Sequence, residues 1–147
     1  RFTGVEPSPY GISVARKNIE QLGLQDRVFV ENLGGEELQY KEEFEIACMT
    51  VVFHEINPSI RLKALENIYN ALKKGGRLII FDPTYPEDFD DFKNPNYGSV
   101  IIHQFNETSL GAVFLNITEQ NEMFAKVGFK DIQRMSFGII DIINAEK

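Results

Sequence analysis

The chain of 147 residues is 43% hydrophobic and 12% aromatic, which is enough for one domain with a sizeable core. Its net charge of −7 and its scattered lysines and arginines exclude the basic stripe that a nucleic-acid backbone requires, and no run of 18 apolar residues could cross a membrane. We therefore expect neither nucleic acid nor membrane as a partner. The single cysteine, Cys48, cannot form an internal disulfide, which suits the cytoplasm, and its apolar neighbours predict a buried side chain.

The first third of the chain predicts a strand, a helix and a second strand. Residues Phe2–Glu6 form the first short strand, and a helix follows with Ser8 as its cap and Pro9 at its first position. Gly23 ends that helix, and the second strand covers residues 27–32.

The middle of the chain predicts two buried strands around a helix. Residues 44–53 are almost all apolar, which indicates a strand buried on both faces, as in a parallel sheet. The helix begins at Ser59 or at the residues around Pro58, and the paired glycines at 75–76 end it. The next buried strand covers residues 77–83.

The pattern then changes. Residues 84–115 are rich in aromatic side chains and show no clean period. A helix over residues 117–129, with Thr118 as its cap, precedes two strands at 130–137 and 139–147 that form a hairpin around a glycine. Alternating strands and helices predict an α/β fold built on a sheet.

An acidic side chain stands at the end of the first strand. Glu6 lies one turn before a helix, and open parallel sheets bind ligands beyond the carboxyl ends of their strands. A carboxylate can accept hydrogen bonds from both hydroxyls of a ribose, so this position suits a nucleoside cofactor. A solvated glutamate in a turn is the alternative.

A histidine and an aspartate follow the two buried strands. His54 comes after the first and Asp82 after the second, so neighbouring parallel strands would bring them into one crevice. A carboxylate that fixes the tautomer of a histidine makes a proton-accepting pair. The alternative is a helix-capping histidine and a turn-closing aspartate.

The ordered series of segments resembles the class I S-adenosylmethionine-dependent methyltransferases, and within them the small-molecule O-methyltransferases of the caffeate and hydroxyindole type. The segments that carry the likeness are the acid-ended first strand, "RVFVENLGGEEL", "FEIACMTVVFHEI", "ALKKGGRLIIFDP" and "EMFAKVGFKDI". The resemblance implies a Rossmann-like sheet of strand order 3-2-1-4-5-7-6 with a C-terminal antiparallel hairpin. It also implies that the first strand and the glycine-rich loop are missing, so that residues 1–147 are the C-terminal part of a catalytic domain, with an insert at about 84–115.

The same resemblance implies a cofactor site for S-adenosylmethionine. Glu6 takes the ribose hydroxyls, and Met49 lines the adenosine. The acid that contacts the adenine has two possible registers. One places it at Gly35-Glu36, with glutamate where the family has aspartate, and the other places Gly34 there, with no acid.

The resemblance also implies the catalytic residues. His54 matches the general base and Asp82 matches one of two acids that flank it, whereas the second acid has no match near Phe114 and Leu115. The usual Asp-Trp after the histidine is replaced by Glu55-Ile56. The aromatic segment from residue 85 to residue 114 is expected to form a lid over the acceptor.

We therefore expect a cytoplasmic enzyme that transfers a methyl group from S-adenosylmethionine to a small molecule, with oxygen as the favoured acceptor atom. The related proteins often carry an N-terminal dimerisation domain, so a homo-oligomer is expected. The alternatives are an N- or C-methyltransferase, in which His54 only shapes the pocket, and an inactive remnant that acts as a dimerisation or binding module. A nicotinamide-dependent dehydrogenase is a third and poorer alternative.

The absence of the central strand predicts an open edge. The first strand of this chain and the apolar strand at residues 44–53 would face each other across a gap one strand wide. We expect either that these two strands pair directly or that a second chain fills the gap.

Overall fold

A computed structural model describes residues 1–88, 90–95, 97–109 and 111–147, and places six strands of this part of the chain in two separate sheets. The smaller sheet contains β1 (Phe2–Val5) and β2 (Val28–Glu31), which run parallel and are joined by α1 (Pro9–Gln21). The predicted cap is confirmed, because the Ser8 hydroxyl accepts the N–H of Gly11.

The larger sheet contains four strands in the order β3-β4-β6-β5. β3 (Phe44–Thr50) runs parallel to β4 (Leu72–Pro83), and β6 (Ile140–Glu146) runs antiparallel to both β4 and β5 (Lys130–Phe137). The strand order within each sheet matches the order that the resemblance implies. β2 and β1 correspond to strands 3 and 2, and β3-β4-β6-β5 correspond to strands 4, 5, 7 and 6. The predicted α/β fold and its C-terminal hairpin are confirmed.

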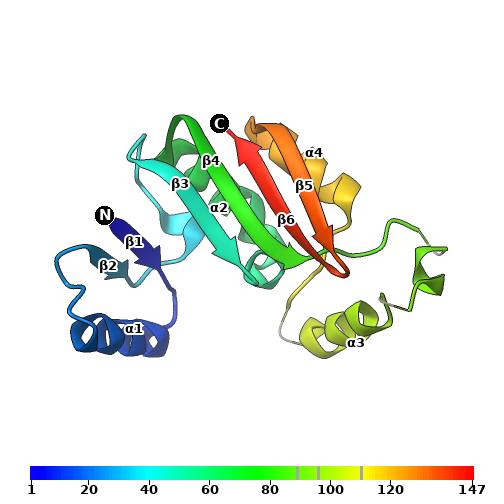
Figure 1. The fold of residues 1–147 in the computed structure, drawn as a ribbon, viewed down its shortest axis with the longest axis horizontal. Coiled ribbons are helices and arrows are strands. Elements are labelled where there is room, and N and C mark those ends of the chain that lie inside the picture. The colour runs from blue at the N-terminus through cyan, green and yellow to red at the C-terminus, as the bar shows by residue number, and fades with distance from the viewer. Residues whose placement is uncertain (89, 96, 110) are drawn as a thin grey trace.

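The two sheets do not pair with each other, so the expected direct closure of β1 on β3 is wrong. Figure 1 shows the β1-α1-β2 unit standing beside the larger sheet. The connection from β2 to β3 contains the short 3-10 helix η1 (Gly35–Glu37), and the side-chain amide of Asn67 donates to the carbonyl oxygens of Gly35 and Glu36 at 3.2 and 2.6 Å. These bonds fasten the connection to α2 (Pro58–Ala71).

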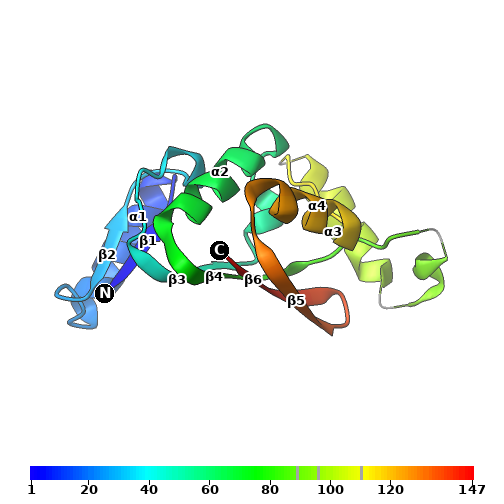
Figure 2. The ribbon, with the colours of Figure 1, turned by 90° about the horizontal axis from the view of Figure 1, so that it is seen from above.

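Helices α2 and α4 (Ile117–Val127) lie on one face of the larger sheet (Figure 2). The core lies between this face and the helices, and its buried apolar residues are Phe53, Leu65, Ile68, Leu72, Leu78, Ile80, Phe124, Phe129, Ile143 and Ala145. Among the described residues, no helix covers the opposite face (Figure 2), where Ile46 is 56% exposed. β3 is therefore buried on one face rather than two, and Cys48 is exposed, contrary to the prediction.

Several predicted boundaries are corrected. α2 ends at Ala71 because Leu72 already pairs with Phe44 and begins β4. The predicted start of α2 around Pro58 is confirmed, with Asn57 as its cap, whereas the cap of α4 is Asn116 rather than Thr118. An asparagine oxygen reaches the N–H groups two and three residues further on, as at Asn57 to Ser59 (2.9 Å) and Asn116 to Glu119 (2.8 Å).

The aromatic segment contains structure that its pattern did not predict. A 3-10 turn, η3 (Asp91–Lys93), precedes the helix α3 (Tyr97–Thr108), which lies away from the larger sheet (Figure 1). None of the helices in the described part of the chain is long and apolar enough to cross a bilayer.

Candidate active site

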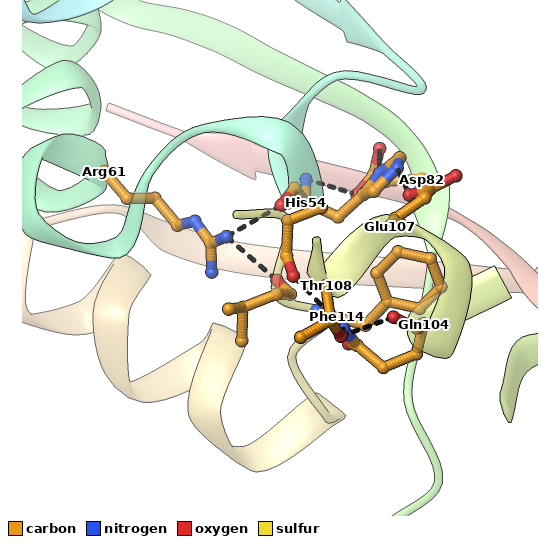
Figure 3. Close-up of polar contacts among 9 residues, drawn as sticks. His54, Arg61, Asp82, Gln104, Glu107, Thr108 and Phe114 are labelled. Carbon is orange, nitrogen blue, oxygen red and sulfur yellow. Dashed lines mark hydrogen bonds and ion pairs between the residues drawn. The ribbon is translucent and has the colours of Figure 1, made fainter. Parts of the chain in front are cut away.

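His54 and Asp82 meet at the carboxyl ends of β3 and β4. β3 stops at Thr50, Val51 takes a positive φ of 53°, and the chain turns into the short helix η2 (Phe53–Glu55) that carries His54. The backbone N–H of His54 donates to Asp82 Oδ2 at 2.9 Å, and the ring Nδ1 lies 3.0 Å from Asp82 Oδ1 (Figure 3). The two side chains are only 3% and 1% exposed. Asp82 therefore fixes both the position of His54 and the tautomer in which Nδ1 carries a proton.

A second carboxylate lies at the other ring nitrogen of His54. Glu107, near the end of α3, places Oε2 3.0 Å from His54 Nε2. Sequence reasoning looked for a second flanking acid near Phe114 and Leu115 and missed this one. Residues 84–115 show no clean period in the sequence, so no local pattern pointed to Glu107. Phe114 instead contacts the imidazole edge-on, with 4.6 Å between ring centroids.

These contacts decide the charge of His54. Burial by itself would lower the pKa of His54, but the hydrogen bond to Asp82 and the charges of Asp82, Glu107 and Glu55 outweigh it and raise the pKa above its ordinary value. His54 therefore keeps its proton to a higher pH than a free imidazole does. In this arrangement its ring lies between the carboxylates of Asp82 and Glu107, which favour the protonated form.

A buried arginine holds the surroundings of His54 in place. Arg61, on α2, is 1% exposed and donates through Nη2 to the carbonyl oxygens of His54 (3.0 Å) and Val113 (2.8 Å). Its Nε donates to the carbonyl oxygen of Ile56 at 3.1 Å. Burial lowers the pKa of Arg61, although the charges of Asp82 and Glu119 oppose the shift. Arg61 thus ties α2, η2 and the segment before α4 together.

Glu6 lies at the carboxyl end of β1, as predicted, and is partly buried. Its Oε1 accepts the N–H of Ser8 at 2.8 Å, and the side-chain amide of Asn32 donates to the carbonyl oxygens of Glu6 and Pro7. A Cβ at Gly11 would lie 2.7 Å from Glu6 Cγ, so the absence of a side chain at Gly11 lets the Glu6 side chain lie against the first turn of α1.

The two registers for the adenine-contacting acid fall on one turn, and the choice between them stays a prediction. The Glu36 carboxylate folds back over Gly34, where a Cβ would overlap it, while Glu37 closes the turn by accepting the N–H of Gly34 at 2.8 Å. The register at Gly35-Glu36 would use the Glu36 carboxylate, whereas the register at Gly34 would supply no acid. Met49 lies in β3, is partly buried and packs against the core.

Two cavities lie near these elements. One of about 270 Å³ lies beyond the end of β4 and is lined by residues of the aromatic segment and of the β5-β6 hairpin, among them Thr84, Tyr85, Tyr97 and Asp141. His54 is not among the residues that line it. The other, of about 360 Å³, lies between α1 and β2, away from His54, and is more open.

The sequence of residues 1–78 matches a family described as "Methyltransferase domain". The chain is 25% identical over 151 residues to a demethylmenaquinone methyltransferase of Lactiplantibacillus plantarum, with 92% of this chain and 63% of that protein covered. It is 29% identical over 75 residues to the ubiquinone/menaquinone biosynthesis C-methyltransferase UbiE of Pectobacterium carotovorum, with 51% of this chain and 30% of that protein covered. The chain thus spans less than two thirds of the length of either relative.

Solved structures with the same fold cover almost the whole chain. The mitomycin 7-O-methyltransferase MmcR superposes with a TM-score of 0.80 at 18% identity over 99% of this chain and 41% of its own. The S-adenosylmethionine-dependent methyltransferase SibL superposes with a TM-score of 0.74 at 17% identity over 99% of this chain and 42% of its own. At such identities the likeness establishes the Rossmann-like methyltransferase fold.

Proposed function

Because this chain belongs to the methyltransferase domain family, we propose that it supplies the catalytic base for methyl transfer from S-adenosylmethionine to a hydroxyl group of a small molecule. The observation that carries the proposal is the buried pair of His54 and Asp82 at the carboxyl ends of β3 and β4, in which the carboxylate holds Nδ1 and leaves Nε2 as the nitrogen that can accept a proton. The alternative is that His54 caps a helix and Asp82 closes a turn. Those roles are usually filled by exposed side chains, whereas these two side chains are buried.

The residues around β1 and β2 fit a nucleoside cofactor. The Glu6 carboxylate stands at a strand end beside a glycine that leaves room for it, and the Glu36 carboxylate lies in the turn after β2. Glu6 would accept hydrogen bonds from the ribose hydroxyls, and Glu36 would face the adenine. When bound, S-adenosylmethionine supplies a methyl group that its sulfonium charge has already activated.

The protein's part in the reaction is to position the acceptor and to take its proton. Neutral His54 would accept the hydroxyl proton at Nε2 while the acceptor oxygen takes the methyl group that the cofactor supplies. Asp82 keeps Nδ1 protonated throughout and stabilises the imidazolium that forms. Because the two carboxylates raise the pKa of His54, the rate should increase as the pH rises through that pKa.

Methylation of a carbon atom is a second candidate, favoured by the relative named as a C-methyltransferase. A ring carbon next to a hydroxyl becomes nucleophilic when that hydroxyl loses its proton, so the same base would serve. The position of the new methyl group in the product distinguishes the two.

The test uses the whole protein, S-adenosylmethionine and a panel of phenols and hydroquinones. His54→Ala should lower turnover by about 10²–10⁴-fold while cofactor affinity stays nearly unchanged, and Asp82→Asn should show a smaller loss of the same kind. His103→Ala, at an exposed histidine of α3, is the matched control. Turnover of His54→Ala within threefold of the wild type would remove His54 as the base and favour a role in shaping the pocket.

A further inference from the structure

The nitrogen of His54 that would take the acceptor's proton is already occupied. Nε2 carries one hydrogen-bonding site in the plane of the ring, and Glu107 Oε2 stands 3.0 Å from it. An acceptor hydroxyl needs the same position at the same distance. The carboxylate and the acceptor therefore exclude each other, and the arrangement in Figure 3 is a closed one.

The helix that carries Glu107 buries one residue, Val100, and leaves much of its apolar surface exposed. Segments outside regular helices and strands flank α3, and Ile102 and Phe105 on its surface are 63% and 81% exposed. Gln104 accepts the N–H of Phe114 at 2.7 Å and donates to the carbonyl oxygen of Ala112 at 3.1 Å, so these bonds join α3 to the segment that follows it rather than to the sheet.

The contact between Glu107 and His54, by contrast, joins α3 to the end of the larger sheet. His54 is fixed by Asp82 at the end of β4, and Glu107 Oε2, which has no hydrogen-bond partner among the described residues, is held at Nε2 as an ion pair. The Glu107 side chain is 28% exposed, so the contact depends on the charge of His54 without confining Glu107 in the core.

We propose that α3 is a lid latched by Glu107, whose carboxylate holds the acceptor's place at Nε2 of protonated His54 and leaves when His54 loses its proton or an acceptor hydroxyl takes that place. The part that concerns the acceptor rests on the proposed function, whereas the latch itself does not. An acceptor that already binds as its anion replaces one negative charge with another, so acidic hydroxyls such as those of phenols would open the lid most readily.

The direction of the pH dependence follows from the charges around His54. The latch needs a positive His54 and a negative Glu107, so it holds below the pKa of His54 and weakens as the pH rises through it. The other charged groups near His54 are Asp82 at Nδ1, Glu55 on the same turn and Arg61 on α2. His103, on α3 itself, is the second histidine of the chain and is removed from the experiment so that a single imidazole is followed.

The test is hydrogen exchange of the α3 amides in a His103→Gln background, in which His54 is the remaining histidine. An isolated helix of 12 residues is marginal in water, so the protection of these amides reports whether α3 is docked. The protection factors, corrected for intrinsic exchange, should fall at least tenfold as NMR of the His54 ring shows it losing its proton. No cofactor or acceptor is present, so this result is independent of whether the proposed reaction is correct.

Two variants separate the latch from a general effect of charge. Glu107→Gln should leave α3 weakly protected at every pH and abolish the pH dependence, while the amides of β4 and α4 keep their protection and show that the fold is intact. Glu55→Gln should move the titration of His54 to lower pH and shift the opening of α3 with it. The proposal is overturned if α3 protection does not follow the titration of His54, or if Glu107→Gln retains that dependence. Should Glu107→Gln fail to fold, Glu107→Asp keeps the charge and should show the same opening at a lower pH.

Discussion

Glu6 is the residue on which cofactor binding is expected to depend most. Its Oε1 already accepts one N–H, from Ser8, so the carboxylate is held at the strand end before any ligand arrives. Hydrogen bonds to a charged group contribute about 1.5–3 kcal/mol. Glu6→Ala in the whole protein should weaken S-adenosylmethionine binding by that amount in isothermal titration calorimetry.

The matched control for Glu6 lies on the adjacent helix. Glu20, on α1, is exposed, and Glu20→Ala should leave the dissociation constant unchanged. An unchanged dissociation constant for Glu6→Ala would remove Glu6 from the site.

The sequence located His54 and Asp82 but not Glu107, and the reason is physical. The first two end apolar strands of one parallel sheet, and such strands bring their ends together whatever else the chain does. Glu107 reaches His54 through a helix with irregular segments on either side, so its position depends on tertiary contacts that no local pattern encodes.

The position of α2 relative to the site depends on a single buried side chain. Arg61 satisfies the carbonyl oxygens of His54, Ile56 and Val113, and its guanidinium lies over the ring of Phe53, 5.3 Å from the centroid. Arg61→Ala would remove this donor from all three carbonyls, of which the His54 oxygen keeps the N–H of Val113, at about 1–3 kcal/mol for each buried group left unpaired.

We expect Arg61→Ala to lower the free energy of unfolding in urea by at least about 3 kcal/mol. Arg27→Ala, at an exposed arginine before β2, should change it by less than about 0.5 kcal/mol. A loss for Arg61→Ala as small as that of the control would mean that these three bonds do not stabilise the fold.

The predictions of secondary structure and burial were wrong where contacts with other strands and helices determine them. Leu72 continues the apolar spacing of α2, yet it pairs with Phe44 and the chain becomes strand. The apolar run of β3 predicted burial on both faces, but helices cover only one face of this sheet in the described residues, so Ile46 remains exposed. The hairpin strands, whose register depends on the turn between them, were predicted almost to the residue.

At the scale of the whole molecule, the two sheets differ greatly in how well they are packed. The larger sheet shares a core with α2 and α4, whereas in α1, which the structure describes in full, Ile12 is the buried residue. The β1-α1-β2 unit is also smaller than the roughly 40 residues below which a domain seldom stands alone. Its exposed apolar residues include Phe2 (71%) and Tyr10 (79%).

The separation of the two sheets has a consequence for cooperativity. A weakly packed unit opens on its own, so unfolding of this chain should not be a single two-state transition, and native-state exchange should show the amides of α1 opening at a much lower free energy than those of β4. Glu6 lies in that unit, so a nucleoside held between Glu6 and Glu36 would have to order it first. Added S-adenosylmethionine should then slow exchange in α1 more than in β4 of the whole protein, and equal slowing in both would contradict this view. The measured affinity for the cofactor would then be lowered by the free energy needed to order the β1-α1-β2 unit.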